Sequence, residues 1–141
     1  MADGVAPAPQ ASPSGPGLAS FKDLCLDAND HQRLADWWCR ALGYVRREQV
    51  QGATRPLDWP VPIVDPSGGG PLIWIVPVPE RKSVKNRMHM DVFGRTQELL
   101  AAGATLVRAR DDEIQWDVLA DPEGNEFCVF APPAPPPPAS G

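Results

Sequence analysis

The stretch that decides the fold is FKDLCLDANDHQRLADWWCRALGYV, residues 21–45. Its first seven residues alternate apolar and polar side chains, which is typical of a strand. The apolar residues that come next recur at helical spacing, which predicts a helix. Asn29 or Asp30 can cap the start of this helix, and Gly43 can adopt the left-handed conformation that ends it. A further strand begins directly after this glycine, so the order is strand, helix, glycine, strand.

Residues 88–107, MHMDVFGRTQELLAAGATLV, repeat this order. Residues 88–92 alternate as a strand, Thr96 can cap the helix, and Gly103 can end it. Each half is expected to continue with two more strands, at 63–64 and 72–76 in the first half and at 115–119 and 126–130 in the second. The sequence therefore predicts an α+β fold of two βαβββ units, with the helices on one side of the sheets and a central cleft between the halves.

The two ends of the chain differ in composition from its middle. Residues 1–19 are rich in Ala, Pro, Gly and Ser, and residues 132–141 are almost entirely Pro and Ala. Neither segment carries enough apolar side chains to offset the entropy cost of ordering it, so we expect both to be disordered tails. A single domain over residues 20–131 is expected, because a chain of 141 residues is too short for two.

Charge, hydropathy and cysteine content exclude several classes of partner. The formal net charge is −5, and the one basic cluster, residues 81–87, is more typical of a charged loop than of a nucleic-acid surface. No apolar run approaches the ~18 residues of a membrane span, and the N-terminus lacks the features of a secretory signal. The three cysteines, Cys25, Cys39 and Cys128, cannot all pair. We expect a cytoplasmic protein that binds neither nucleic acid nor a membrane.

Three motifs resemble those of one family. They are LADWWCRALGY at residues 34–44, KNRMHMD at residues 85–91 and WDVLADPEGNEFCV at residues 116–129. They are similar, in this order, to the first helix, the fifth strand and the closing hairpin of the vicinal-oxygen-chelate superfamily, the glyoxalase/bleomycin-resistance group. The resemblance covers nearly all of residues 21–130. It implies a glyoxalase-like paired half-barrel around a cleft that handles a small molecule, and it implies a homodimer.

Members of that superfamily commonly hold a divalent metal with side chains on the first, fourth, fifth and eighth strands. The resemblance places these positions at Asp23, at Ile75 or Val76, at His89 and at Cys128, with Glu126 two residues before the last. Isoleucine and valine cannot bind a metal, so the set lacks one corner and no cofactor is expected. If a divalent metal (Zn, Ni, Co, Fe or Mn) binds, its ligands are expected to be Asp23, His89, and Cys128 or Glu126.

The same residues allow roles without a metal. His89 and Asp91 lie on one face of their strand, so a carboxylate–imidazole contact can either line the cleft or serve as a general acid and base. In the catalytic reading, Asp23 and Glu126 are the proton-transfer partners of His89. The Cys128 thiol is either packed and inert, as its apolar neighbours suggest, or reactive beside a cation that lowers its pKa.

The tryptophans divide into two groups. Trp37 and Trp38 are expected in the core between the first helix and the sheet. Trp59, Trp74 and Trp116 are expected to line the cleft with His89, Asp91 and Cys128, where they can stack on a planar or aromatic ligand. Core packing is the alternative for Trp74 and Trp116. Trp59 lies in a proline-rich loop, which makes it a candidate lid residue.

These features support three hypotheses about function. The first is a glyoxalase/bleomycin-resistance-like protein that binds a small planar or aromatic metabolite or drug without the full metal site. The second is a lyase or isomerase that uses His89 with Asp23 and with Glu126 or Cys128 as metal or acid/base partners. The third is an interaction protein that uses the proline-rich tail, residues 132–141, as a polyproline II ligand.

Overall fold

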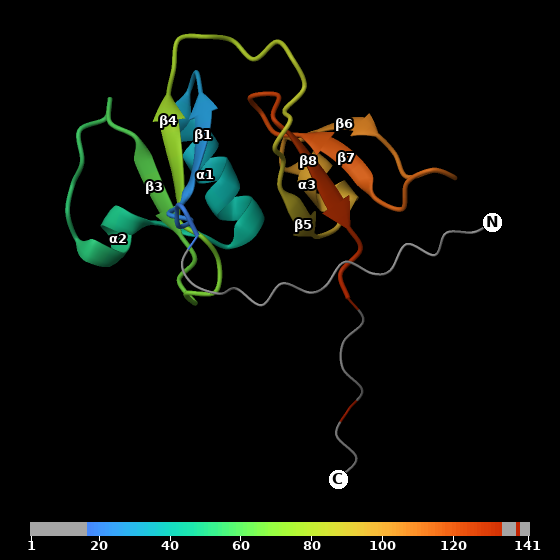
Figure 1. Cartoon of the computed structure of the whole chain (residues 1–141), viewed down its shortest axis with the longest axis horizontal. Helices are drawn as coiled ribbons and strands as arrows, with labels where there is room; N and C mark the ends of the chain where they lie inside the picture. The colour runs from blue at the N-terminus through green and yellow to red at the C-terminus, as the bar shows by residue number, and fades with distance from the viewer. Residues whose placement is uncertain (1–16, 134–137, 139–141) are drawn as a thin grey trace.

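A computed structural model describes residues 17–133 and 138 of the chain (Figure 1). The first half comprises six elements: β1 (Leu24–Ala28), α1 (His31–Leu42), β2 (Val45–Arg46), α2 (Arg47–Gln51), β3 (Val61–Val64) and β4 (Ile73–Pro77). The second half comprises five: β5 (Asp91–Phe93), α3 (Thr96–Ala101), β6 (Thr105–Arg108), β7 (Asp117–Ala120) and β8 (Glu126–Phe130). Apart from the short helix α2, which the sequence analysis does not predict, each half is a βαβββ unit.

The two halves form two four-stranded sheets of the same topology. The first sheet has the order β1-β4-β3-β2, and the second has the order β5-β8-β7-β6. In each sheet the first and last strands of the unit pair in parallel, while the other neighbours are antiparallel. Figure 1 shows the sheets as separate bodies joined by the segment between β4 and β5. The predicted α+β fold of paired βαβββ units is confirmed.

Local sequence signals set the ends of α1. The Asp30 side chain accepts a hydrogen bond of 3.1 Å from the backbone N–H of Arg33, as expected for a residue that caps a helix. Gly43 has a φ of 71°, a left-handed conformation that glycine adopts without steric cost, and its backbone N–H bonds the carbonyl of Cys39. Both predicted boundaries are confirmed.

Helix α1 supplies packing to both halves. Its residues Leu34, Ala35, Trp37 and Trp38 are buried. On one side they join a core that contains Ile63, Ile73 and Ile75 of the first sheet. On the other side, both tryptophan rings pack edge-on against Phe127 of β8, with ring centroids 5.8 and 5.1 Å away. The predicted core role of Trp37 and Trp38 is confirmed, and one apolar core spans the two halves.

Several details of the second half differ from the sequence prediction. Helix α3 ends at Ala101 with Ala102 in the cap position instead of Gly103, and the strand predicted at 115–119 is β7, Asp117–Ala120. The strand predicted at 88–92 begins only at Asp91, so His89 precedes β5 instead of lying within it. Thr96 does not cap α3: it is the first helical residue, and Arg95 takes the cap position without a side-chain bond. The Thr96 hydroxyl instead donates to Asp117 of β7 at 2.5 Å. This carboxylate lies 21 residues away in the sequence, which local pattern cannot reveal.

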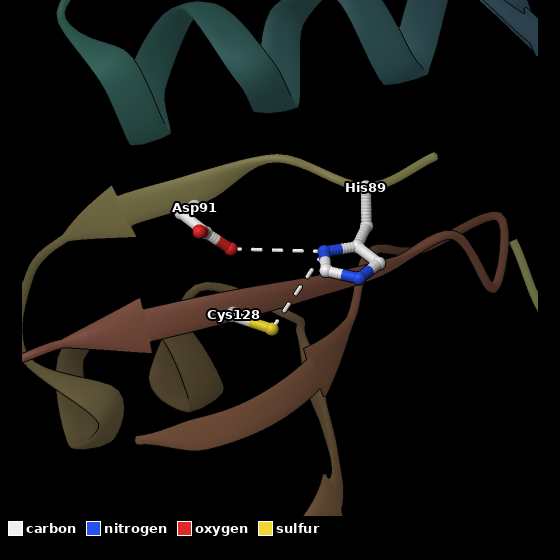
Figure 2. A group of neighbouring side chains, drawn as sticks. All are labelled: His89, Asp91 and Cys128. Carbon is white, nitrogen blue, oxygen red and sulfur yellow. Dashed lines mark hydrogen bonds and ion pairs between the residues drawn. The ribbon is translucent and has the colours of Figure 1, made fainter. Parts of the chain in front are cut away.

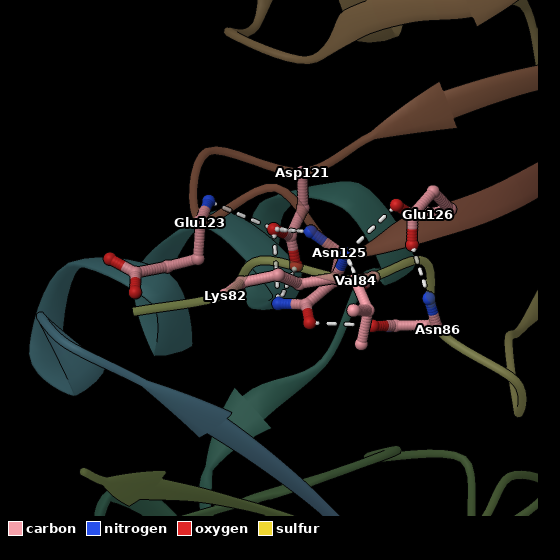
Figure 3. A network of polar contacts seen from close by, with 7 residues as sticks. All are labelled: Lys82, Val84, Asn86, Asp121, Glu123, Asn125 and Glu126. Atoms are coloured by element: carbon pink, nitrogen blue, oxygen red, sulfur yellow. Dashed lines mark hydrogen bonds and ion pairs between the residues drawn. The ribbon is translucent and has the colours of Figure 1, made fainter. Parts of the chain in front are cut away.

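The turn between β7 and β8 connects the second half to the first half and to the linker, residues 78–90 between β4 and β5. Figure 3 shows the contacts with the linker. The Glu123 carboxylate accepts hydrogen bonds from the backbone N–H groups of Asn29 and Asp30 at the start of α1. The Glu126 carboxylate accepts from the Lys82 ammonium and from the backbone N–H of Asn86, each at 2.8 Å. The turn is therefore bonded to both sides of the molecule.

None of the helices in the described part of the chain has the length and apolar content needed to cross a bilayer. Most of the tails predicted to be disordered, residues 1–19 and 132–141, lies outside the described residues, so their disorder stays a prediction. The domain bounds of 20–131 also stay a prediction.

Candidate functional site

Strand β8 presents two different faces. Phe127 and Val129 are 1% and 0% exposed and point into the apolar core. Glu126, Cys128 and Phe130 alternate onto the opposite face, as the period of a strand over 126–130 requires. Because β5 pairs in parallel with β8, with Asp91 opposite Cys128, the polar residues of both strands meet on this face.

His89, Asp91 and Cys128 form the polar centre of this face (Figure 2). The His89 Nδ1 atom lies 3.6 Å from a carboxylate oxygen of Asp91 and 3.8 Å from the sulfur of Cys128. The three potential ligand atoms lie within 4.8 Å of one another. Over residues 17–133 and 138, this is the only group of three or more such side chains close enough to hold a metal ion.

The surroundings of Cys128 keep its thiol neutral. Burial raises the pKa of Cys128, and the negative charge of Asp91, together with a hydrogen bond to it, raises the pKa further. The positive charge of Lys85 opposes this rise only in part. A protonated thiol is a weak nucleophile, so these surroundings favour the packed, inert reading of Cys128 over the reactive one.

A cavity of about 320 Å³ opens over this cluster. One wall is aromatic: the rings of Trp116 and Phe130 lie 5.4 Å apart at an interplanar angle of 31°. Arg108 at the rim is already paired with Asp111 and Glu113. The lining residues are Lys85, His89, Asp91, Arg108, Ile114, Trp116, Val118, Glu126, Cys128 and Phe130.

A second, smaller cavity of about 150 Å³ lies between the halves. It is lined by Leu24, Cys25 and Leu26 of β1 and by Met88, His89 and Met90 next to β5, among others. His89 therefore lines both cavities. The larger space, however, lies over the second sheet alone.

Asp23 is held on the other half of the molecule. Its carboxylate accepts a hydrogen bond of 3.0 Å from the indole N–H of Trp74 and pairs with Lys22. The hydrogen bond from Lys22 lowers the pKa of Asp23, and the bond from Trp74 adds to this against the opposing effect of burial. Asp23 is not part of the group around His89.

Glu126 lines both cavities, but its carboxylate is engaged by the linker. Burial would raise the pKa of Glu126, but the hydrogen bonds from Lys82 and Asn86 outweigh it and lower the pKa. The Glu126 carboxylate is therefore ionised and holds the linker through hydrogen bonds. Like Asp23, Glu126 lies outside the group formed by His89, Asp91 and Cys128.

The structure separates the three tryptophans that were expected together. Trp116 lines the 320 Å³ cavity. Trp74 lies on the first sheet, and Trp59, which is 51% exposed, lies in the loop before β3. Trp74 contacts the side chains of Arg47 and Arg55, and Trp59 contacts that of Arg55. Neither arginine was singled out from the sequence.

Five residues of the cavity were not predicted from the sequence as part of it: Lys85, Arg108, Ile114, Val118 and Phe130. Phe130 supplies half of the aromatic wall, although its alternation with Cys128 on β8 already indicates its direction. Lys85 belongs to the basic cluster at 81–87, interpreted only as a charged loop, and the structure places it at the cavity.

Two βαβββ units with parallel β1–β4 and β5–β8 pairs, and a polar cluster on the face of β5 and β8, define the class of glyoxalase-like α+β domains. The glyoxalase-like domain family matches residues 23–130. The chain belongs to this family.

Solved structures share the fold at low sequence identity. A glyoxalase/bleomycin resistance protein/dioxygenase family enzyme from Burkholderia phytofirmans is 19% identical with a TM-score of 0.58, covering 79% of this chain and 97% of that one. A fosfomycin resistance protein from Mesorhizobium loti is 10% identical with a TM-score of 0.58, covering 83% and 94%. Glyoxalase I from Leishmania major is 14% identical with a TM-score of 0.54, covering 80% and 86%. No curated protein matches the chain significantly in sequence.

Proposed function

We propose that the chain binds a small planar or aromatic molecule in the cavity over β5, β7 and β8. The observation that carries this proposal is the pairing of an aromatic wall, Trp116 and Phe130, with the polar cluster around His89. A volume of about 320 Å³ is at the lower end of the range for small-molecule sites, which suits a ligand of one or two rings.

Aromatic and polar residues of the lining have different roles in binding. A flat ligand can gain apolar contact and stacking against Trp116 and Phe130, which both line the cavity. His89 and Asp91 can fix its orientation through hydrogen bonds, since 36% and 60% of their side-chain surfaces are exposed. Lys85 adds a positive charge that forms no ion pair with the described residues. The site therefore favours a planar ligand with hydrogen-bonding groups on one edge.

A ligand-observed NMR screen of planar heteroaromatic compounds tests this proposal. We expect saturable binding that His89→Ala weakens at least fivefold. The matched control is His31→Ala, because the chain has only two histidines and His31 contacts the carbonyl of Leu57 on the first half. Binding that both variants weaken equally, or no binding across a broad library, would overturn the proposal.

A specific observation also favours a second candidate, a metal-dependent lyase or isomerase. Zinc–ligand bonds of about 2.0–2.3 Å at tetrahedral angles separate donor atoms by roughly 3.3–3.8 Å. The distances of 3.6 and 3.8 Å around His89 Nδ1 lie in this range, and the third pair of donor atoms, on Asp91 and Cys128, lies within 4.8 Å. Nitrogen, oxygen and sulfur donors suit zinc and related metals, so the residues fit such an ion. A divalent metal here would act as a Lewis acid on a substrate oxygen.

In this candidate, His89, Asp91 and Cys128 would hold the metal. Asp91 would take the place that the resemblance gives to Asp23, since the Asp23 carboxylate bonds Trp74. Of the two alternatives for the last ligand, Cys128 would serve, since the Glu126 carboxylate bonds Lys82. Cys128 would have to lose its proton on binding. Metal affinity should therefore rise with pH.

Titration of the full chain with zinc, followed by calorimetry, separates the two candidates. The second candidate predicts one equivalent bound, with at least a tenfold loss of affinity in both Cys128→Ser and Asp91→Asn. Cys39→Ser is the control, because that thiol lies outside the group. Retained affinity in the two variants, or no stoichiometric binding, would leave the metal-free proposal alone.

Most of the proline-rich tail lies outside the described residues, so its role as an interaction motif stays a prediction. The homodimer and the cytoplasmic location stay predictions as well.

A further inference from the structure

Four side chains form an alternating stack of arginine and tryptophan on the first half of the molecule. The Arg47 guanidinium lies 4.9 Å from the centre of the Trp74 ring. The Arg55 guanidinium lies 5.5 Å from the same ring and 5.3 Å from the ring of Trp59. Trp74 therefore contacts two cations, and Arg55 contacts two aromatic rings.

This stack lies on the face of the first sheet that points away from α1. Ile73 and Ile75, the neighbours of Trp74 on β4, are 2% and 0% exposed and belong to the core. Side chains alternate along a strand, so the indole of Trp74 points to the opposite face. The stack is thus separate from the cavity over the second sheet, and its chemistry is independent of the function proposed for that cavity.

Neither arginine of the stack has an anionic partner among the described residues. Arg46, their neighbour, pairs with Asp36 and Glu48 and donates to Gln32. In contrast, the ion pairs formed within the described part of the chain include neither Arg47 nor Arg55. Two guanidinium groups are therefore gathered around one indole without a described carboxylate paired to either.

Arg55 also carries an unsatisfied donor. Its Nε atom is buried and has no hydrogen-bond partner within the described residues. A buried donor without an acceptor destabilises the folded state, so such groups are rare in folded proteins. Arginine presents Nε–H and a neighbouring N–H along one edge, and this edge matches the two oxygens of a planar carboxylate.

We propose that Arg47, Arg55, Trp59 and Trp74 form a binding site for a small aromatic carboxylate. The carboxylate supplies the acceptor that Arg55 Nε lacks and neutralises the two guanidinium groups. The half-exposed ring of Trp59 offers a flat apolar surface for the body of the ligand. Because Nε is covered, the Arg55 side chain must rotate as the ligand enters. It can do so because its neighbours at 52–54 and 56–59 are all exposed.

The experiment is a titration of the ¹⁵N-labelled full chain with sodium benzoate at constant ionic strength. The signals are the Nε–H of Arg55 and the indole N–H groups of Trp59 and Trp74. We expect saturable shifts of these three signals with one affinity, and at least a tenfold loss of that affinity in Arg55→Gln. Shifts confined to Trp116 would report the cavity over the second sheet instead and would contradict this site.

Two further variants keep the test decisive. Arg33→Gln removes the same charge from an exposed position on α1, and it should change the affinity by less than twofold. If Arg55→Gln disturbs the loop, Arg55→Lys keeps the charge but lacks the paired N–H edge, and it should still weaken binding severalfold. Equal losses in Arg33→Gln and Arg55→Gln, an absence of saturation, or identical shifts with inorganic phosphate would overturn the carboxylate site.

Discussion

At the scale of single residues, hydrogen-bond partners decide which charged groups are free to act. Glu126 and Asp23 carry carboxylates, which are common general acids and bases, but each carboxylate is already hydrogen-bonded to its own neighbours. The side chains of His89, Asp91 and Lys85 line the cavity without an ion pair or hydrogen bond to described residues outside it. The hydrogen bonds to Glu126 and Asp23 therefore exclude these two carboxylates from the site, which leaves Asp91 as its acidic group.

A buried hydrogen bond between Trp38 and Asp121 provides a residue-scale prediction. The Trp38 indole N–H donates to the Asp121 carboxylate at 2.9 Å, and both residues are almost fully buried. Trp38→Phe removes the donor, so we expect a loss of about 1–3 kcal/mol in the free energy of unfolding at pH 7. Urea unfolding followed by circular dichroism measures this loss.

The pH dependence of this variant has a definite sign. Burial raises the pKa of Asp121, and the bond from Trp38 partly opposes that rise. Without the bond the pKa of Asp121 rises further, so the difference in stability from the wild type should shrink as the pH falls and the carboxyl group protonates. Trp116→Phe is the control, because the Trp116 indole makes no hydrogen bond to the described residues. An effect as large in the control would contradict the explanation.

At the scale of elements, Asp117 connects three pieces of the second half. It lies on β7 and accepts hydrogen bonds from Thr96 at the start of α3 and from Arg110 after β6. These bonds, first that from Thr96, lower the pKa of Asp117 from 3.8 to about 2. The carboxylate form is thus stabilised by folding, so its contribution is complete above the ordinary pKa and disappears as the pH falls towards 2.

We therefore expect Asp117→Asn to lower the free energy of unfolding by about 1–3 kcal/mol at pH 7 and by much less near pH 2. Chemical denaturation at both pH values measures the difference. Asp112→Asn makes the same change at an exposed position without hydrogen bonds to the described residues and should have little effect at either pH. A pH-independent loss in Asp117→Asn would show that the carboxylate charge is not the cause.

The features that were predicted correctly from the sequence depend on residues close to one another in the chain. The cap at Asp30 and the left-handed Gly43 depend on neighbours within a few residues. The alternation of Glu126, Cys128 and Phe130 against Phe127 and Val129 depends only on the period of a strand. The two βαβββ units could be predicted for the same reason.

The features that escaped prediction depend on contacts between distant segments. The hydroxyl of Thr96 bonds Asp117 because α3 lies against β7, and the register of β1 against β4 brings Asp23 next to Trp74. The contacts of Arg55 depend on the path of an irregular loop. The sequence therefore indicated the three central residues of the candidate site, His89, Asp91 and Cys128, but only part of its lining.

At the scale of the whole molecule, the core belongs to both halves. Phe127 of the second half packs against Trp37 and Trp38 of the first. Helix α3 has no fully buried residue, so it contributes little to covering its own sheet. The two halves should therefore unfold in one transition.

Phe127→Ala tests this coupling. Removing a buried aromatic ring costs about 3–5 kcal/mol, and we expect both halves to lose that stability together. The indole signals of Trp74 and Trp116, one in each half, should disappear at the same urea concentration. Phe93→Ala is the matched control, because that ring is 71% exposed. Separate midpoints for the two tryptophans would show that the halves are independent.

The two repeats have the same topology, but they share one large helix, α1, which belongs to the first repeat. A piece of the chain ending within residues 78–90 would keep α1 together with the sheet on which it packs. The remaining piece would carry Phe127 and Val129 on a sheet whose cover it had lost. Produced separately, the first piece should expose the Trp37 and Trp38 rings that Phe127 contacts, and the second should aggregate unless the first is present. Mixing the two would then restore one folded particle, so this domain could serve as a split reporter whose reassembly is driven by a tryptophan pair closing on a phenylalanine.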